Sequence, residues 1–83
     1  SNTHLEFEIL CKFNNDKEEV IKLGYLLDMK LLSDYHLYWL AEMLIFLVEI
    51  IQLNKNNLRI REHNKDELSH YSSATFDIDF LYP

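Results

Sequence analysis

The sequence predicts an α+β fold of order β-α-α-β-β, in which two helices pack on one face of a small, mostly antiparallel three-stranded sheet. Apolar and polar residues alternate near both ends of the chain, as in half-buried strands, and a long, very apolar run fills the middle. Hydrophobic residues make up 48% of the 83 residues, with one Gly and one Pro, a composition typical of folded proteins. We therefore expect residues 1–83 to form a single domain.

The first expected strand covers residues 4–13. Its alternation places five apolar side chains on one face: Leu5, Phe7, Ile9, Cys11 and Phe13. The charged side chains of the strand point to the other face. We expect Cys11 to be a buried core residue and not a nucleophile, because burial raises the pKa of a thiol.

A helix is expected over residues 16–32. Asn15 followed three residues later by Glu18 matches a helix-capping arrangement, and the apolar residues that follow recur at intervals of three and four. Gly24 lies on this apolar stripe. A glycine within a helix costs stability, so we expect another element to approach its backbone closely; a plain surface position is the alternative.

A second helix is expected to begin with Ser33 or Asp34 as its cap and to run to about residue 54. Its polar positions form one narrow stripe: Tyr35, Tyr38, Glu42, Glu49 and Gln52. Such a helix is buried on most of its circumference, or one side of it binds a partner. The apolar run 37–53 is too short, and too interrupted by carboxylates, to favour a membrane span.

Two further strands are expected over residues 58–61 and 75–81, joined by a polar connection over residues 63–74. The last strand alternates three apolar residues, Phe76, Ile78 and Phe80, with two aspartates. The alternation does not determine the order of the strands in the sheet.

Four carboxylates are expected on the outer face of the sheet: Glu6, Glu8, Asp77 and Asp79. If the strand 58–61 lies between the first and last strands, Arg59 and Arg61 sit among these carboxylates and the face is a ladder of cross-strand charge pairs. If that strand lies at an edge, the acidic face is concentrated into a docking surface for a basic protein. The first arrangement is favoured, because directly opposed like charges are destabilising.

No motif for catalysis, metal binding or cofactor binding stands out. The single cysteine and the four histidines show no metal-ligand spacing, and a chain with one glycine cannot build a glycine-lined phosphate cradle. We therefore expect no catalytic residues, no metal, no cofactor and no enzyme activity. Fourteen acidic against eight basic residues give a net charge of -6, which disfavours direct binding of nucleic acid and favours a basic protein partner.

These observations lead to a small acidic, non-enzymatic protein-binding module of the cytoplasm, most simply an immunity or antitoxin-like inhibitor of a basic protein such as a nuclease. The expected partner-binding residues combine acids with exposed aromatics: Glu6, Glu8, Asp77, Asp79, Tyr71 and Tyr82. The alternative is a structural or oligomerisation domain of a larger assembly that associates through the apolar second helix, for example as a homo-dimer. An enzyme is the third and least favoured class.

Overall fold

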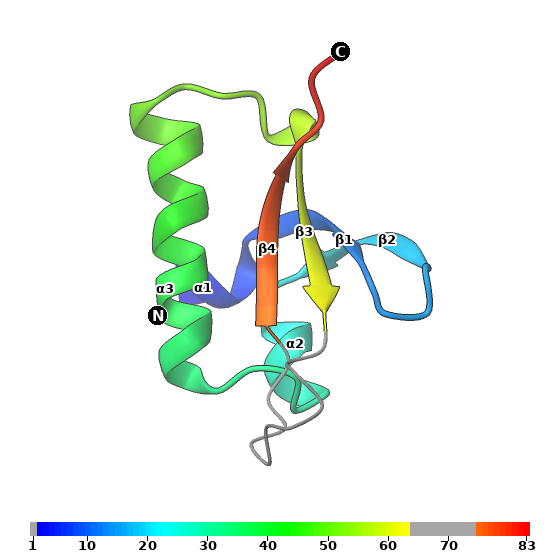
Figure 1. The fold of residues 1–83 in the computed structure, drawn as a ribbon. Helices are drawn as coiled ribbons and strands as arrows, with labels where there is room; N and C mark the ends of the chain where they lie inside the picture. The colour runs from blue at the N-terminus through cyan, green and yellow to red at the C-terminus, as the bar shows by residue number, and fades with distance from the viewer. Residues whose placement is uncertain (1, 64–74) are drawn as a thin grey trace.

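The computed structural model describes residues 2–63 and 75–83, which form a four-stranded mixed sheet with helices on one side (Figure 1). The elements follow one another along the chain as α1 (Asn2–Glu6), β1 (Glu8–Lys12), β2 (Glu18–Lys22), α2 (Gly24–Asp28), α3 (Asp34–Ile45), η1 (Phe46–Ile50), η2 (Lys55–Asn57), β3 (Leu58–His63) and β4 (Thr75–Phe80). The sheet order is β2-β1-β3-β4, with β1 parallel to β3 and the other two pairs antiparallel. The expected α+β class is confirmed, whereas the three-stranded sheet is wrong.

The fourth strand, β2, lies where the sequence predicts the first half of a helix. A tight turn follows β1, in which the Phe13 amide donates to the Lys17 carbonyl over 2.8 Å and Asp16 takes a left-handed φ of 68°. The Asn15 side chain accepts a hydrogen bond from the Lys17 amide at 3.0 Å, as in an Asx turn. An Asx turn and a helix cap use the same kind of side-chain hydrogen bond. The pattern at Asn15 therefore predicted the start of a helix where a hairpin turn forms.

The N-terminal helix α1 also differs from expectation, since residues 4–6 belong to it and β1 begins only at Glu8. Gly24 begins the short helix α2 instead of lying within a long one. A Cβ atom at this glycine would lie 3.2 Å from the Leu5 carbonyl oxygen of α1. The expected close approach at Gly24 is therefore confirmed, and α1 is the element that approaches.

Helix α3 begins as the sequence predicts. Ser33 is its N-cap, and the Ser33 hydroxyl accepts a hydrogen bond from the His36 amide at 3.2 Å. The helix continues into the π-helical turn η1, and Gln52, with a φ of 65°, follows where the helical conformation ends. Within the described residues, no helix combines the length and apolar character needed to cross a membrane.

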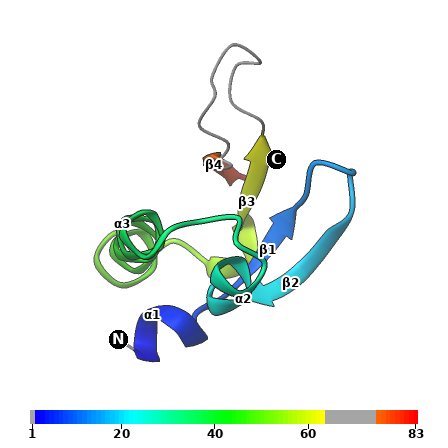
Figure 2. The same ribbon diagram turned by 90° about the horizontal axis from the view of Figure 1, so that it is seen from below.

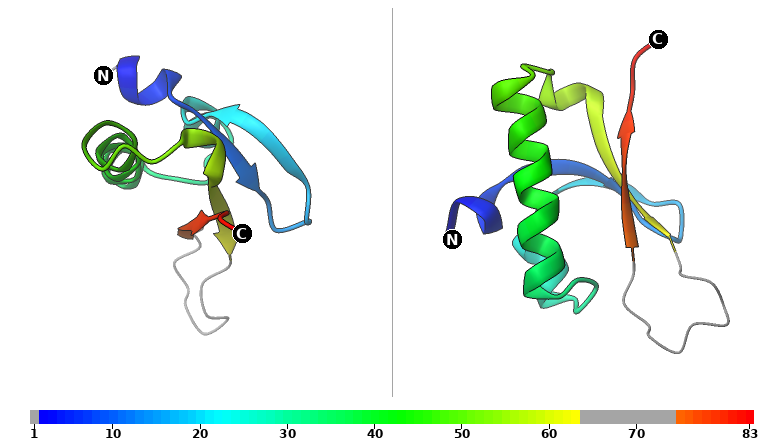
Figure 3. Two further views of the ribbon diagram at one scale, coloured as in Figure 1. Left: turned by 90° about the horizontal axis from the view of Figure 1, so that it is seen from above. Right: turned by 60° about the vertical axis from the view of Figure 1, so that its left-hand side comes forward.

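Helices α1, α2 and α3 lie on the same side of the sheet (Figure 2). The hydrophobic core fills the space between these helices and the strands. Residues of both the sheet and the helices, with their connections, are buried in this core: Ile9, Cys11, Ile21, Leu23, Leu26, Leu32, Leu37, Ala41, Leu44, Leu58 and Ile60. Figure 3 shows α3 standing beside β4, so the long helix borders the open edge of the sheet. No helix formed by residues 2–63 and 75–83 covers the outer face of the sheet (Figure 2).

Candidate functional site

The outer face of the sheet carries eight charged side chains, because the strand register places every second residue of each strand on it. Four are acidic and four are basic: Glu8, Glu18, Asp77 and Asp79, with Lys12, Lys22, Arg59 and Arg61. We call this surface the charged face. Strand β3 lies between β1 and β4, so the arrangement favoured from the sequence is confirmed and a concentrated acidic face is excluded.

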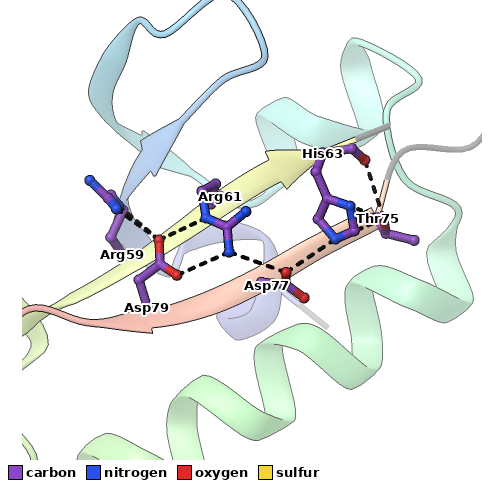
Figure 4. Close-up of polar contacts among 6 residues, drawn as sticks. All are labelled: Arg59, Arg61, His63, Thr75, Asp77 and Asp79. Carbon is purple, nitrogen blue, oxygen red and sulfur yellow. Dashed lines mark hydrogen bonds and ion pairs between the residues drawn. The ribbon is translucent and has the colours of Figure 1, made fainter. Parts of the chain in front are cut away.

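Arg59 lies near the middle of the charged face and joins three strands. Its Nε and Nη2 atoms donate to Asp79 Oδ2 on β4 at 3.1 and 2.9 Å (Figure 4). Its Nη1 atom donates to Glu18 Oε1 on β2 at 3.1 Å. These contacts raise the pKa of the Arg59 guanidinium above its ordinary value, through the hydrogen bonds to Asp79 and Glu18. The side chain thus ties β3 to both edge strands of the sheet.

Asp79 accepts hydrogen bonds from two guanidinium groups. Besides Arg59, the Nε atom of Arg61 donates to Asp79 Oδ2 at 3.2 Å. Burial by itself would raise the pKa of the Asp79 carboxyl, which is about 20% exposed, but the hydrogen bonds and charges of the two arginines lower it below the usual range. Asp79 is therefore ionised at neutral pH and holds both arginines over the strand.

The charged face ends at the far end of the β3–β4 pair with His63, Thr75 and Asp77. Asp77 Oδ2 lies 3.3 Å from Arg61 Nη2 and 3.2 Å from His63 Nε2, and the Thr75 hydroxyl donates to the His63 carbonyl at 3.2 Å (Figure 4). Every carboxylate of β4 thus faces a base on β3, as cross-strand pairing of opposite charges requires.

The residues expected to bind a partner do not form one surface. Glu8 lies opposite Lys22 on the charged face, whereas Glu6 belongs to α1, with its carboxylate 2.8 Å from Lys22 Nζ. Tyr82 is exposed beyond the end of β4, and Tyr71 lies outside the described residues. The role of these residues in partner binding stays a prediction.

Cys11 is fully buried on the inner face of β1, which confirms it as a core residue. Burial, helped by the nearby charges of Glu62 and Glu19, raises the pKa of the Cys11 thiol to about 12. The thiol is therefore neutral and unreactive at physiological pH. Within residues 2–63 and 75–83, no three His, Cys, Asp or Glu side chains gather as metal ligands would.

An apolar groove between α3 and β4 was not expected from the sequence. It has a volume of about 520 Å³, and most of its lining is apolar: Leu32, Trp39, Leu40, Met43, Leu47, Phe76, Ile78 and Phe80, with His36, Thr75 and Asp77. Trp39, Met43 and Phe80 are each about half exposed. The one sequence feature that could have indicated this groove is the spacing of Trp39 and Met43, which lie four residues apart on one helix face.

The chain is similar to glycine–tRNA ligases. The ligase of Mesoplasma florum is 44% identical over 71 residues, which are 86% of this chain and 16% of that ligase. The ligase of Ruminiclostridium cellulolyticum is 35% identical over 79 residues, 95% of this chain and 13% of the ligase. That of Borrelia hermsii is 33% identical over 79 residues, 92% of this chain and 18% of the ligase.

The chain thus spans less than a fifth of the length of these curated relatives. No protein-family model and no solved structure matches it.

These relatives correct the function expected from the sequence. The immunity or antitoxin-like inhibitor is wrong, because the similar proteins are named as ligases. That name does not test the alternative of a structural or oligomerisation domain. The expectations of no enzyme, of a basic protein partner and of no nucleic acid are likewise contradicted, since that name describes an enzyme that acts on tRNA. The net charge of -6 was a poor guide, because net charge bears on solubility and association and does not by itself identify a function.

Proposed function

We propose that this chain is a segment of a glycine–tRNA ligase. The observation that carries the proposal is the 44% identity to the Mesoplasma florum ligase across 86% of the chain. The complete ligase would join glycine to tRNA in the cytoplasm. Residues 1–83 would form one folding unit within it and supply four strands of its sheet.

The charged face supports a framework role for this segment. Arg59 and Arg61 cross-link β3 to β4 through Asp79, and Arg59 also reaches Glu18 of β2. Charge-assisted hydrogen bonds of this kind hold side chains in defined positions more firmly than neutral ones do. A sheet fixed in this way would position neighbouring parts of the ligase.

A chimeric enzyme tests the proposal. The matching stretch of the Mesoplasma florum ligase is replaced by the corresponding residues of this chain, and the attachment of radiolabelled glycine to tRNA is measured. We expect kcat/KM within about tenfold of the parent ligase, which is about 1.4 kcal/mol of transition-state stabilisation. Labelled alanine and serine serve as controls, and neither should be attached.

A second chimera carries the change Ile60→Asp, which places a charge in the buried centre of β3. It should lose glycine attachment together with its folded structure, as seen by circular dichroism. A first chimera that folds like the parent ligase but attaches no glycine to tRNA would contradict the proposal.

A further inference from the structure

The groove between α3 and β4 follows the open edge of the sheet. Its lining includes Phe76, Ile78 and Phe80, whose side chains lie on the inner face of β4. It also includes Thr75 and Asp77, whose side chains lie on the opposite face. Residues from both faces of one strand can border a single groove only along the strand's edge. Figure 3 shows this edge beside α3.

The backbone of β4 presents unpaired groups to the groove. The Leu81 amide donates to the Asn57 carbonyl at 2.7 Å, which makes these two residues a hydrogen-bonded pair. Antiparallel pairing alternates, so Asp77 and Asp79 direct their backbone groups toward β3, while Phe76, Ile78 and Phe80 direct theirs outward. Within the part of the chain that the structure describes, no strand pairs with this edge.

An exposed edge beside an apolar wall is a surface that proteins normally cover. Trp39 and Met43 of α3 are 56% and 52% exposed, and Phe80 is 53% exposed. These side chains and the outward amides of β4 border the same groove, so one occupant can cover both. Among polypeptide elements that could cover the groove, an extended chain can pair with these amides and a helix cannot, because a helix uses its own carbonyls for its own amides.

The length of the relatives indicates where such a chain comes from. The matched stretches are 13 to 18% of the ligases, so most of each ligase lies outside the part that resembles this chain. A segment of the same polypeptide reaches the groove at a high effective concentration and loses little freedom on docking. The charge on β4 specifies its composition, since Asp77 and Asp79 flank the edge on the outer face.

We infer that the edge of β4 is completed by a β-strand from elsewhere in the same ligase polypeptide, with alternating apolar and basic side chains. Its apolar residues fill the groove against Trp39 and Met43, and its Lys or Arg residues lie beside Asp77 on the charged face. This inference rests on the proposed function, because it takes the chain to be a segment of a ligase. It adds a fifth strand to the sheet and names the surface that receives it.

Amide hydrogen exchange in the Mesoplasma florum chimera tests the inference residue by residue. The amides of Phe76, Ile78 and Phe80 should exchange within about tenfold of those of Asp77 and Asp79, because both sets are then hydrogen-bonded in a sheet. Outward amides that exchange about a hundredfold faster than the inward ones would overturn the inference. The inward amides are an internal control, since their partners on β3 are present in either case.

Two variants of the chimera separate backbone pairing from apolar packing. Phe80→Ala removes the ring and keeps the outward amide, whereas Phe80→Pro removes both. If a strand pairs there, Phe80→Pro should speed exchange at Ile78 by about tenfold beyond the effect of Phe80→Ala. Equal effects of the two variants would count against strand pairing.

The remaining outcomes are also decisive. The exchange is measured at two protein concentrations about a hundredfold apart, and protection that grows with concentration would assign the groove to a second copy and overturn the inference.

A chimera that attaches glycine but leaves the outward amides unprotected would reject the added strand and keep the proposed function. A chimera that folds and protects the outward amides but attaches no glycine would support the added strand and contradict the proposed function. A chimera in the Ruminiclostridium cellulolyticum ligase provides the same readouts if the first host does not fold.

Discussion

Strands β3 and β4 present two surfaces that differ in how completely they are paired within the chain. On the charged face, Asp77 and Asp79 each contact basic side chains of β3. On the groove side, the outward edge of β4 pairs with none of the described strands, and Trp39 of α3 is 56% exposed. The same two strands therefore combine a face on which each carboxylate has a base of β3 beside it with an edge that pairs with none of the described strands.

The largest expected effect comes from the core beneath the charged face. Ile60→Ala should lower the free energy of unfolding by about 2–5 kcal/mol, because Ile60 is fully buried at the centre of β3. Urea unfolding followed by circular dichroism measures the change. Val20→Ala, at an exposed position of β2, is the matched control and should cost less than about 0.5 kcal/mol. Equal losses would mean that the sheet does not bury its inner face as described.

Breaking the charged face should have the next largest effect. Asp79→Asn should cost about 1–3 kcal/mol, because two arginines lose the anion that they share. The more exposed Asp77→Asn should cost less than Asp79→Asn. The measurement is the difference in denaturation midpoint between the two variants, and a larger effect at Asp77 would contradict the central place given to Asp79.

The pH dependence sharpens the same comparison. The pKa of Asp79 is lowered in the folded state, so its contribution to stability is present above the unfolded value of about 4 and is lost as the pH falls through the folded value. The wild-type chain should therefore lose more stability on acidification below about pH 4 than Asp79→Asn does. Parallel pH profiles for the two proteins would show that Asp79 does not carry this dependence.

The buried thiol of Cys11 should affect the free energy of unfolding at alkaline pH. The folded-state pKa of Cys11 is about 12, so above about pH 9 the unfolded thiol ionises while the folded one keeps its proton. Stability should fall with rising pH, by at most about 1.4 kcal/mol per pH unit from this group. In Cys11→Ala this pH-dependent component is absent. The free energies of unfolding of wild type and Cys11→Ala, measured by urea unfolding between pH 8 and 11, should therefore converge as the pH rises.

The smallest effect is expected at the wall of the groove. Trp39→Ala should change the free energy of unfolding of the 83-residue chain by less than about 0.5 kcal/mol, because the ring is more than half exposed. Leu37→Ala, on the buried face of the same helix, is the control and should cost about 2–5 kcal/mol. A large loss at Trp39 in the 83-residue chain would mean that the groove is already filled without further polypeptide.

Much of the local structure could be predicted from residue patterns. The alternation of apolar residues identified β1, β3 and β4, the Ser33 cap identified the start of α3, and Cys11 was placed in the core. The helix expected over residues 16–32 failed because the Asn15 side chain caps a hairpin turn, which the same local pattern also allows. For the candidate site, the placement of Arg59 and Arg61 among carboxylates was foreseen. The contributions of β2, Glu18 and Lys22, were not, and neither was the groove.

By itself, the sequence determined which residues are apolar on each face of β1, β3 and β4, because that periodicity is a property of neighbours along the chain. Only the tertiary structure decided that β3 lies between β1 and β4, which placed Arg59 between Glu18 and Asp79 and left the β4 edge open beside α3. Strand order depends on contacts between residues far apart in sequence, and no local pattern encodes it. The edge and the groove exist only once that order is set.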